Sequence, residues 1–409
     1  MRDNKDKKSP LGQEGNAYLA ELDKCGRCGN CLPNCPVFAE LQRESSVIRG
    51  RVEILDRLRK GEVEWNEKLA EIFSTCMLCG NCTKACNSGV RGGLLTRMAR
   101  RDIRKFLGPQ KPKDNALFRI LCETGKEPAF CSPDELAAVG SNLPNLAKEE
   151  FLRKLSSKLP KSPIKPKMTI AYFPGCMTYL VNPQIGYDIL EILAAYDVKV
   201  IIPEQKCCGK QAMMEGDFDT AKEVAAKNIT SFAKEEFDYL LFECGSCLTT
   251  WQEYQELLPD AGAQSLIAKG MHISRFLTEV LDIHFDYPAT IAPGKKVTYH
   301  DACHLKETTS GKSAPRELLK RMAPYYQYAE MALADSCCGS IGYFGDFHFD
   351  LSQKILQKKI DSILETKADI VTADSSCCLI NLIYGLREHP EVEVKHIVEL
   401  VAEALRQSL

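Results

Sequence analysis

The chain has 409 residues, 44% of them hydrophobic, and a formal net charge of −2 at pH 7. This length is enough for two or three domains with hydrophobic cores. The near-neutral charge gives no reason to expect binding to nucleic acid or to an anionic membrane surface.

The sequence shows no targeting or membrane-spanning segment. Residues 1–10 are charged and lack the apolar core of a secretory signal. No stretch approaches the roughly eighteen apolar residues that a transmembrane helix needs. We therefore expect a cytoplasmic protein, which reaches the inner face of a membrane only through a partner.

Cysteine is unusually frequent, with 20 residues in the chain. A disulfide scaffold is one explanation, but clustered cysteines in a long chain without a secretory signal more often bind metal. Cys122 and Cys131 stand outside every metal-binding spacing and are interpreted as packing residues.

Residues 15–107 contain two copies of the spacing C-x2-C-x2-C-x3-C, which are Cys25, Cys28, Cys31 and Cys35, then Cys76, Cys79, Cys82 and Cys86. This is the ligand run of a two-cluster 4Fe–4S ferredoxin, in which the fourth cysteine of each run binds the other cluster. Structural zinc is the alternative, but zinc sites use paired C-x2-C hooks separated by long loops. The spacing predicts two 4Fe–4S cubane clusters.

The elements expected around these runs are helical. Apolar residues recur at helical spacing over 41–60 and 94–107, so an α-helical ferredoxin domain is predicted. The second helix is basic, with Arg97, Arg100, Arg101, Arg104 and Lys105. Three roles fit these residues: docking an acidic flavoprotein, raising the potential of a cluster, or forming a solvated face.

Residues 108–167 are rich in proline and lysine. A short helical patch is expected at 148–155, and residues 159–167 have the composition of a stiff, extended linker. We place the main domain boundary at the end of this linker.

Strand and helix patterns alternate after the linker. Strands are expected at 169–173, 199–202 and 239–242, and helices at 183–196 and 219–236. A similar order follows, with strands at 296–299 and 369–372 and helices at 313–322 and 347–364. This alternation predicts two repeated α/β lobes with parallel sheets, at 168–290 and 291–409, in an α+β protein overall.

Each lobe carries a set of cysteines that follow its expected strands. Lobe one has Cys176, Cys207, Cys208, Cys244 and Cys247, and lobe two has Cys303, Cys337, Cys338 and Cys377. Asp374 stands where the repeat places a counterpart of Cys244. Loops at the carboxyl ends of parallel strands converge, and the N-termini of the following helices stabilise thiolates. A metal–sulfur centre is therefore expected in lobe one.

The lobe pattern resembles the cysteine-rich domain of heterodisulfide reductase subunits. The whole arrangement is similar to the iron–sulfur subunits of glycolate oxidase and of related lactate and glycerol-3-phosphate dehydrogenases. The stretches 48–55 (IRGRVEIL) and 87–90 (NSGV) add to this likeness, which covers about residues 20–405. The resemblance implies that the five cysteines of lobe one hold a non-cubane 4Fe–4S cluster.

Lobe two departs from that pattern at Asp374. An aspartate is able to ligate iron through oxygen, and Cys378 could compensate; otherwise the lobe holds a different cluster or is a vacant structural copy. His300 and His304 flank Cys303. Each is a candidate for a hydrogen bond to cluster sulfur, for a ligand, or for an ordinary loop histidine.

No phosphate-binding G-x-G-x-x-G follows a strand, and no catalytic triad can be assembled, so no catalytic residue is predicted. Oxidation of a hydroxy acid releases two electrons as hydride, which a flavin elsewhere must split. The resemblance implies an electron-transfer subunit beside an FAD-containing subunit that oxidises D-lactate or glycolate. The further acceptor is a quinone, an electron-transfer flavoprotein or a thiol–disulfide system. The alternatives are a reductase that cleaves a disulfide at lobe one, and a non-redox scaffold.

Overall fold

The computed structural model describes residues 16–111, 115–123, 157, 166–287, 294–305, 313–339 and 342–408. The helical patch expected at 148–155 and most of the expected linker lie outside these ranges. The chain forms two compact units. The N-terminal unit comprises 1–116, 211–218 and 339–355, and the two-lobed unit comprises 117–210, 219–338 and 356–409.

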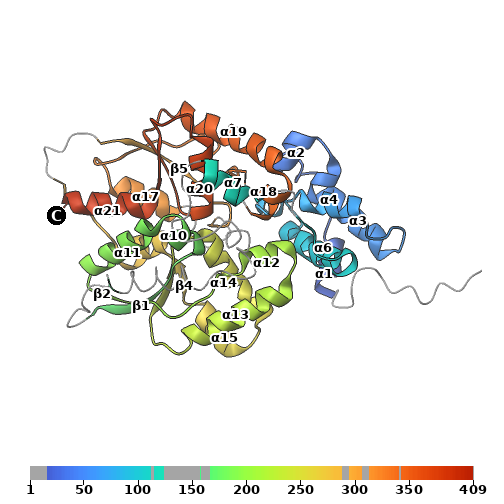
Figure 1. Cartoon of the computed structure of the whole chain (residues 1–409), viewed down its shortest axis with the longest axis horizontal. Helices are drawn as coiled ribbons and strands as arrows, with labels where there is room; N and C mark the ends of the chain where they lie inside the picture. Colours follow the sequence, from blue (N-terminus) through green and yellow to red (C-terminus); the bar gives the residue numbers. More distant parts are fainter. Residues whose placement is uncertain are drawn as a thin grey trace, which may run out of the picture. The chain divides into compact units, whose positions relative to one another are not determined.

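The N-terminal unit is helical, which confirms the prediction. Its helices are α1 (Asn16–Asp23), α2 (Pro36–Leu41), the 3-10 turn η1 (Glu44–Ser46), α3 (Ile48–Arg59), α4 (Glu67–Ser74), α5 (Asn81–Lys84) and α6 (Gly92–Leu107) (Figure 1). Two later helices, α12 (Lys210–Glu215) and α18 (Tyr343–Phe347), fall in the segments that join this unit.

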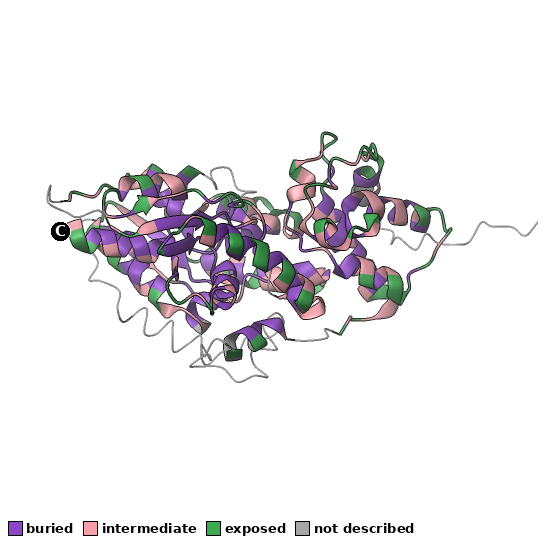
Figure 2. Cartoon of the chain, turned by 90° about the horizontal axis from the view of Figure 1, so that it is seen from above, coloured by how far each residue is buried: buried purple, intermediate pink, exposed green. Residues whose placement is uncertain are grey.

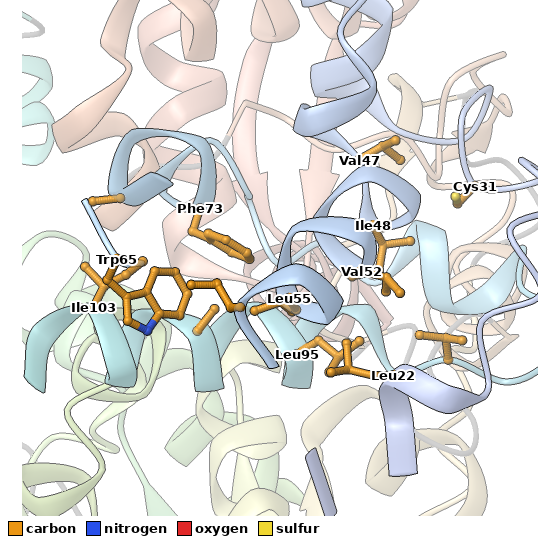
Figure 3. Packing of buried hydrophobic residues seen from close by; sticks show 14 residues of the cluster. Leu22, Cys31, Val47, Ile48, Val52, Leu55, Trp65, Phe73, Leu95 and Ile103 are labelled. Carbon is orange, nitrogen blue, oxygen red and sulfur yellow. The ribbon is translucent and has the colours of Figure 1, made fainter. Parts of the chain in front are cut away.

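The core of the N-terminal unit lies between α3, α4 and α6. Val52 and Leu55 of α3 and Phe73 of α4 are buried in one cluster (Figure 3). Trp65 packs edge-on against Phe73, with ring centroids 5.7 Å apart. The Asn66 side chain accepts a hydrogen bond from the Leu69 backbone N–H and starts α4. These contacts fix the start of α4 and hold it against the core, and the helix ends at Ser74, directly before the second cysteine run.

The two-lobed unit contains two parallel sheets, as predicted, and each of them has four strands. Lobe one has the order β2-β1-β3-β4, with β1 (Met168–Phe173), β2 (Val198–Ile201), β3 (Tyr239–Phe242) and β4 (Gly270–His272). Lobe two has the order β6-β5-β7-β8, with β5 (Lys296–His300), β6 (Gln327–Tyr328), β7 (Ile370–Ala373) and β8 (Glu393–His396).

Helices surround these sheets, and the buried positions concentrate on the strands and on the inward faces of the helices (Figure 2). Lobe one has α10 (Cys176–Leu180), α11 (Pro183–Ala195), α13 (Phe218–Phe232), α14 (Gly245–Leu257), α15 (Ala261–Ile267), α16 (Ile273–Arg275) and the π-helix η2 (Phe276–Val280). Lobe two has α17 (Ser313–Arg321), α19 (Phe349–Glu365), α20 (Ser376–Gly385) and α21 (Ile397–Ser408), and α7 (Ala116–Glu123) precedes both lobes. No helix in the described ranges is both long and apolar enough to cross a membrane.

The repeat extends to individual hydrogen bonds. The Thr169 backbone N–H donates to Asp238 at 2.9 Å, and the Lys296 N–H donates to Asp369 at 2.7 Å. The two lobes also bind one another, since the Gly245 N–H donates to the Asp374 carbonyl at 3.1 Å. The strand ends that carry the cysteines therefore belong to one unit.

Candidate metal centres

The cysteines of the two N-terminal runs interleave. Cys35 of the first run lines one small cavity with Cys76, Cys79 and Cys82 of the second. Burial, and after it the nearby charges of Cys76 and Cys35, raise the pKa of Cys82 to about 12. Four thiols around a shared cavity, three from one run and one from the other, fit the ligand pattern of a 4Fe–4S cluster.

The other three cysteines of the first run also lie near one another. Burial raises the pKa of Cys31; a backbone hydrogen bond from Arg49 opposes this, and the charges of Cys25 and Cys28 add to it. A Cβ placed on Gly26 would lie 3.8 Å from Ser88 Oγ, so this run passes beside the loop that follows Cys86. The membership of Cys86 in this second set, which the spacing predicts, stays a prediction.

Two buried arginines hold the end of α4, where backbone carbonyls lack helical partners. The Arg100 guanidinium donates to the carbonyls of Phe73 at 3.0 Å, Ser74 at 3.3 Å and Cys76 at 2.6 Å. Arg51 donates to Thr75 Oγ1 at 2.9 Å. Burial opposes ionisation of Cys76, but the charges of Arg51 and Arg100 outweigh it and lower the pKa of this thiol.

Arg100 also binds the two segments that return to the N-terminal unit. It donates to the Met214 carbonyl at 2.7 Å and lies 4.0 Å from the centre of the Tyr343 ring. Within the basic helix α6, Arg97 and Arg100 are buried, whereas Arg104 pairs with Asp217 at 2.6 Å. The interpretation of these basic residues as one solvated face is therefore wrong. The docking of an acidic flavoprotein on this helix stays a prediction.

Lobe one brings its five predicted cysteines together. The pKa of Cys176 is raised, first by a hydrogen bond with Cys207 and then by burial. The pKa of Cys208 is likewise raised by its bond to Cys207, and Cys247 bonds both Cys208 and Cys244. Gly209 has φ of 80°, which opens the turn after the cysteine pair.

The start of α14 stabilises one of these thiols as an anion. Cys244 caps the helix, and its pKa is lowered to about 6, first by a hydrogen bond from Cys247 and then, against burial, by the backbone N–H groups of Cys247 and Ser246. A helix N-terminus favours thiolate in this way. The expectation that helix ends support the cysteines is met at this position.

Glu243 is a site residue that the sequence reasoning missed. It is fully buried; its carboxylate accepts hydrogen bonds from the Gly175 N–H at 2.6 Å and the Thr178 hydroxyl at 2.5 Å, and burial raises its pKa to about 7. It thereby links the loop before Cys176 to the strand before Cys244. The signal for it was a charged residue at the end of an otherwise apolar strand.

Neighbouring cysteines at the start of α20 lie in different sets. Cys378 bonds Cys338 and feels the charge of Cys303, so it lies with the lobe-two cysteines. Burial raises the pKa of Cys377, and the charges acting on it come first from Cys244 and Cys208 of lobe one and only then from Cys338. The set of Cys303, Cys337 and Cys338 therefore gains Cys378, while Cys377 approaches the lobe-one thiols.

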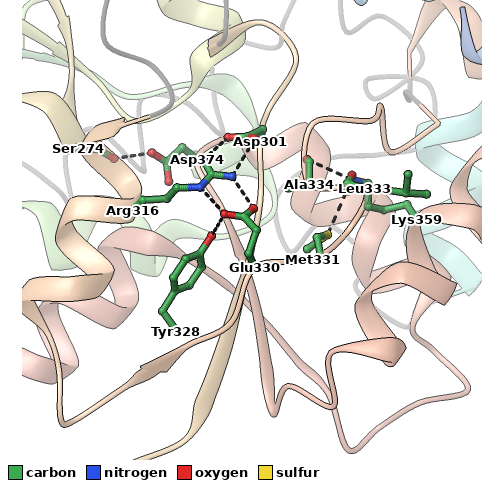
Figure 4. Close-up of polar contacts among 10 residues, drawn as sticks. All are labelled: Ser274, Asp301, Arg316, Tyr328, Glu330, Met331, Leu333, Ala334, Lys359 and Asp374. Carbon is green, nitrogen blue, oxygen red and sulfur yellow. Dashed lines mark hydrogen bonds and ion pairs between the residues drawn. The ribbon is translucent and has the colours of Figure 1, made fainter. Parts of the chain in front are cut away.

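Asp374 occupies the position of Cys244 but contacts other groups. Its carboxylate accepts a hydrogen bond from the Ser274 hydroxyl of lobe one (Figure 4). His272 Nδ1 lies 3.6 Å from the same oxygen, and burial raises the pKa of Asp374 to about 7. Among the described residues, Asp374 joins the two lobes and is absent from the group of close metal-ligating atoms in lobe two.

The two histidines beside Cys303 also separate. His304 Nδ1 lies 2.9 Å from Ser246 Oγ, and its carbonyl accepts a hydrogen bond from the Thr249 hydroxyl at 2.9 Å, so it ties the loop to α14. His300 is fully buried and lies beside Cys338 and Cys378. None of the eighteen cysteines whose side chains the structure describes forms a disulfide.

Comparisons with known proteins agree with these two kinds of site. A family model described as a 4Fe-4S dicluster domain matches residues 21–90, and one described as a cysteine-rich domain matches 170–252 and 297–383. The "Probable glycolate oxidase iron-sulfur subunit" of Bacillus subtilis (strain 168) is 30% identical over 94% of this chain and 94% of its own.

Two other relatives widen the comparison. "Lactate utilization protein A" of Halalkalibacterium halodurans is 30% identical over 57% of this chain and 96% of its own. One subunit of the dihydromethanophenazine:CoB--CoM heterodisulfide reductase of Methanosarcina barkeri is 27% identical over 95% of this chain and 95% of its own. A solved structure of a hypothetical protein from Helicobacter pylori aligns at 12% identity with a TM-score of 0.43, over 66% of this chain and 56% of that one.

Proposed function

Because this chain belongs to the family of iron–sulfur subunits that includes the glycolate oxidase type, we propose that it relays electrons from an FAD-containing dehydrogenase subunit to a further acceptor. The partner oxidises D-lactate or glycolate on its flavin. A bound 4Fe–4S cluster supplies one-electron transfer, whereas the flavin accepts the pair.

The observation that carries this proposal is the interleaving of the two N-terminal runs. Cys35 belongs to the first run yet shares a cavity with Cys76, Cys79 and Cys82. Interleaved runs hold two clusters close together in one helical unit, which suits a relay. We propose Cys25, Cys28, Cys31 and Cys86 as the other ligand set, and the five cysteines of lobe one as a third.

The residues around these thiols support the same role. Arg51 and Arg100 place positive charge beside the second run, which favours the reduced state of a cluster held there. Buried side chains such as Val47 and Ile48 line the cavity and exclude water. No nucleotide-binding loop was predicted, which is why the flavin is assigned to a partner.

The direct test is anaerobic purification of the chain from its own cells with whatever it binds. We expect a flavoprotein to copurify, and D-lactate or glycolate to produce the paramagnetic resonance signals of reduced 4Fe–4S clusters. The matched control is a Cys79→Ser variant, which should lose signal from one cluster while the flavin is still reduced. If these substrates reduce a bound flavin but leave dithionite-reducible clusters oxidised, the relay is refuted.

A second function is favoured by one observation in lobe one. Cys377 adds a sixth thiol near Cys176, Cys207, Cys208, Cys244 and Cys247, and the heterodisulfide reductase relative aligns over 95% of the chain. The alternative is therefore reduction of a disulfide at lobe one. Reduced viologen dye should then drive cleavage of an added disulfide, and a Cys208→Ala variant should abolish this; absence of cleavage by the fully loaded protein would exclude it.

A further inference from the structure

Asp374 is a buried carboxyl group at the place where the two lobes meet. It directly follows β7, it is fully buried, and its Oδ2 atom accepts a hydrogen bond from the Ser274 hydroxyl of lobe one (Figure 4). Its other oxygen, Oδ1, has no hydrogen-bond partner among the described residues. A buried polar atom without a partner is rare in folded proteins and needs an explanation.

No cation balances this carboxyl group. Of the lysines, arginines and histidines that the structure describes, only His272 lies within ion-pair distance, with Nδ1 at 3.6 Å. That nitrogen accepts a hydrogen bond from the Ser274 backbone N–H at 3.3 Å, and Nε2 lies 3.1 Å from the Glu243 carbonyl. The ring proton is therefore on Nε2 and the imidazole is neutral. A buried carboxyl group without a cation favours its protonated form.

Two groups of lobe two add to this effect. The negative charge of Asp301 helps burial to raise the pKa of Asp374 to about 7, although Arg316 binds Asp301 at 2.8 and 3.0 Å. The Tyr299 hydroxyl is fully buried, and after burial the charge of Asp374 is the largest cause that raises its pKa. These surroundings let Asp374 gain or lose a proton near neutral pH at little cost in free energy.

The backbone at Asp374 contacts the start of α14, where Cys244 of lobe one lies. The Gly245 N–H donates to the Asp374 carbonyl at 3.1 Å, and the Ser375 Oγ atom lies 3.8 Å from the Cys244 sulfur. All of these residues are buried. Because charges interact strongly where water is excluded, a charge added at the lobe-one thiols acts on the Asp374 carboxyl group.

We propose that Asp374 takes up one proton from solvent when one electron reaches lobe one, a coupling that rests on the cluster proposed for the five cysteines there. The electron comes through the relay, and the proton forms an O–H bond on the carboxylate, so the net charge of the site is unchanged. The added electron strengthens proton binding, and by linkage the bound proton favours reduction to the same extent. Such coupling suits an acceptor that takes up protons with electrons, as a quinone or a disulfide does.

The experiment measures the midpoint potential of the lobe-one centre between about pH 6 and pH 8 in the full, anaerobically purified chain. Paramagnetic resonance follows a dithionite titration, and a Cys208→Ala variant identifies the signals that belong to lobe one. We expect the potential to become more negative as the pH rises, by at most about 59 mV for each tenfold fall in proton concentration. Asp374→Asn should remove this dependence and leave the potentials of the N-terminal clusters unchanged.

Infrared difference spectra of the unaltered chain give a second readout, which does not depend on how well a variant folds. Reduction should add the C=O stretching band of a buried protonated carboxyl group, and this band should shift in D2O and be missing in Asp374→Asn. Asp188→Asn is the matched control, because it removes another buried carboxyl group of the two-lobed unit, which Arg406 binds at 2.7 Å. It should keep both the band and the pH dependence.

Three results would overturn the coupling: a lobe-one potential that is independent of pH in the unaltered chain, no carboxyl band on its reduction, or an Asp374→Asn variant that keeps the dependence. A folded chain with both N-terminal clusters and no lobe-one centre would also overturn it, and would leave the N-terminal relay standing. If dithionite titration shows the expected pH dependence but D-lactate and glycolate reduce only a bound flavin, the relay is refuted and the role of Asp374 stands.

Discussion

Replacing Arg100 with methionine should strongly destabilise the N-terminal unit. The guanidinium is buried and donates to four carbonyls, those of Phe73, Ser74, Cys76 and Met214. Methionine has a similar length but no donor, so these buried acceptors lose their partner. Each such loss costs about 1 kcal/mol or more, which gives about 4 kcal/mol in total. That is a large part of the roughly 5–15 kcal/mol that stabilises a domain.

The chain offers a clean reporter for this measurement. It has two tryptophans, Trp65 in the N-terminal unit and Trp251 in the two-lobed unit. In a Trp251→Phe background, the fluorescence of Trp65 follows urea unfolding of the N-terminal unit alone. Trp65 packs on Phe73, whose carbonyl binds Arg100, so the reporter lies beside the perturbation.

Arg104→Met is the matched control on the same helix. Its side chain is 34% exposed and forms one ion pair with Asp217, so its loss should cost under about 1 kcal/mol. Both variants remove one positive charge and keep the helix propensity of α6 similar. Equal shifts of the unfolding midpoint in the two variants would refute the reasoning, because net charge rather than carbonyl capping would then explain the effect.

The remaining predictions test strain, charge and linkage. Gly216→Ala should lower the free energy of unfolding by at least about 2 kcal/mol, because φ at this position is 77° and the added Cβ would lie 2.3 Å from a backbone nitrogen. Gly61→Ala has a similar φ of 70° but adds its Cβ in open space, so it should cost only about 1 kcal/mol. Urea unfolding followed by Trp65 fluorescence compares the two variants. Arg51→Met should lower the midpoint potential of the cluster near Cys76, as followed by paramagnetic resonance during a redox titration; an unchanged or higher potential would contradict this. Burial raises the pKa of Asp188 above 3.8, so the folded state holds this proton more tightly than the unfolded state. The protonated Asp188 side chain therefore contributes its full stabilisation below about pH 3.8, and this contribution falls as the pH rises through the folded-state pKa. Asp188→Asn should flatten the dependence of the free energy of unfolding on pH in that range.

The cysteine spacing and the alternation of strands predicted most of the architecture. Both depend on local patterns, namely the reach of a short loop around a cluster and the period of buried positions in a strand. The two-residue strand β6 was not predicted, and neither were the outer strands β4 and β8. They have three and four residues, and polar or small residues such as Gly270 and Lys395 interrupt them. Their positions depend on pairing with β3 and β7, which a single segment does not reveal.

The assignment of individual thiols was less accessible to sequence reasoning. Matching the repeats aligned Cys377 with Cys247 and made Asp374 a candidate ligand. The Asp374 side chain instead meets Ser274, and Cys378 meets Cys338, because packing of the two lobes decides which way each side chain points. Aligning the two repeats by residue number shows which positions correspond along the chain. It does not show how a helix such as α20 is rotated about its axis, and this rotation decides where Cys377 and Cys378 point.

The N-terminal unit includes two short segments, 211–218 and 339–355, that follow the cysteine pairs of the two lobes in the sequence. The chain leaves each lobe directly after its cysteine pair and contributes α12 and α18 to this unit. There Met214 and Tyr343 pack with Leu78, beside Cys76. The loop that carries the second cluster run is thus built partly from residues that follow the cysteine pairs of both lobes. A ferredoxin domain excised at residue 116 would lack the Met214 carbonyl and the Tyr343 ring, both of which Arg100 requires. The second run is therefore complete only when both lobes are synthesised, which couples formation of the relay to the presence of the cysteine-rich unit.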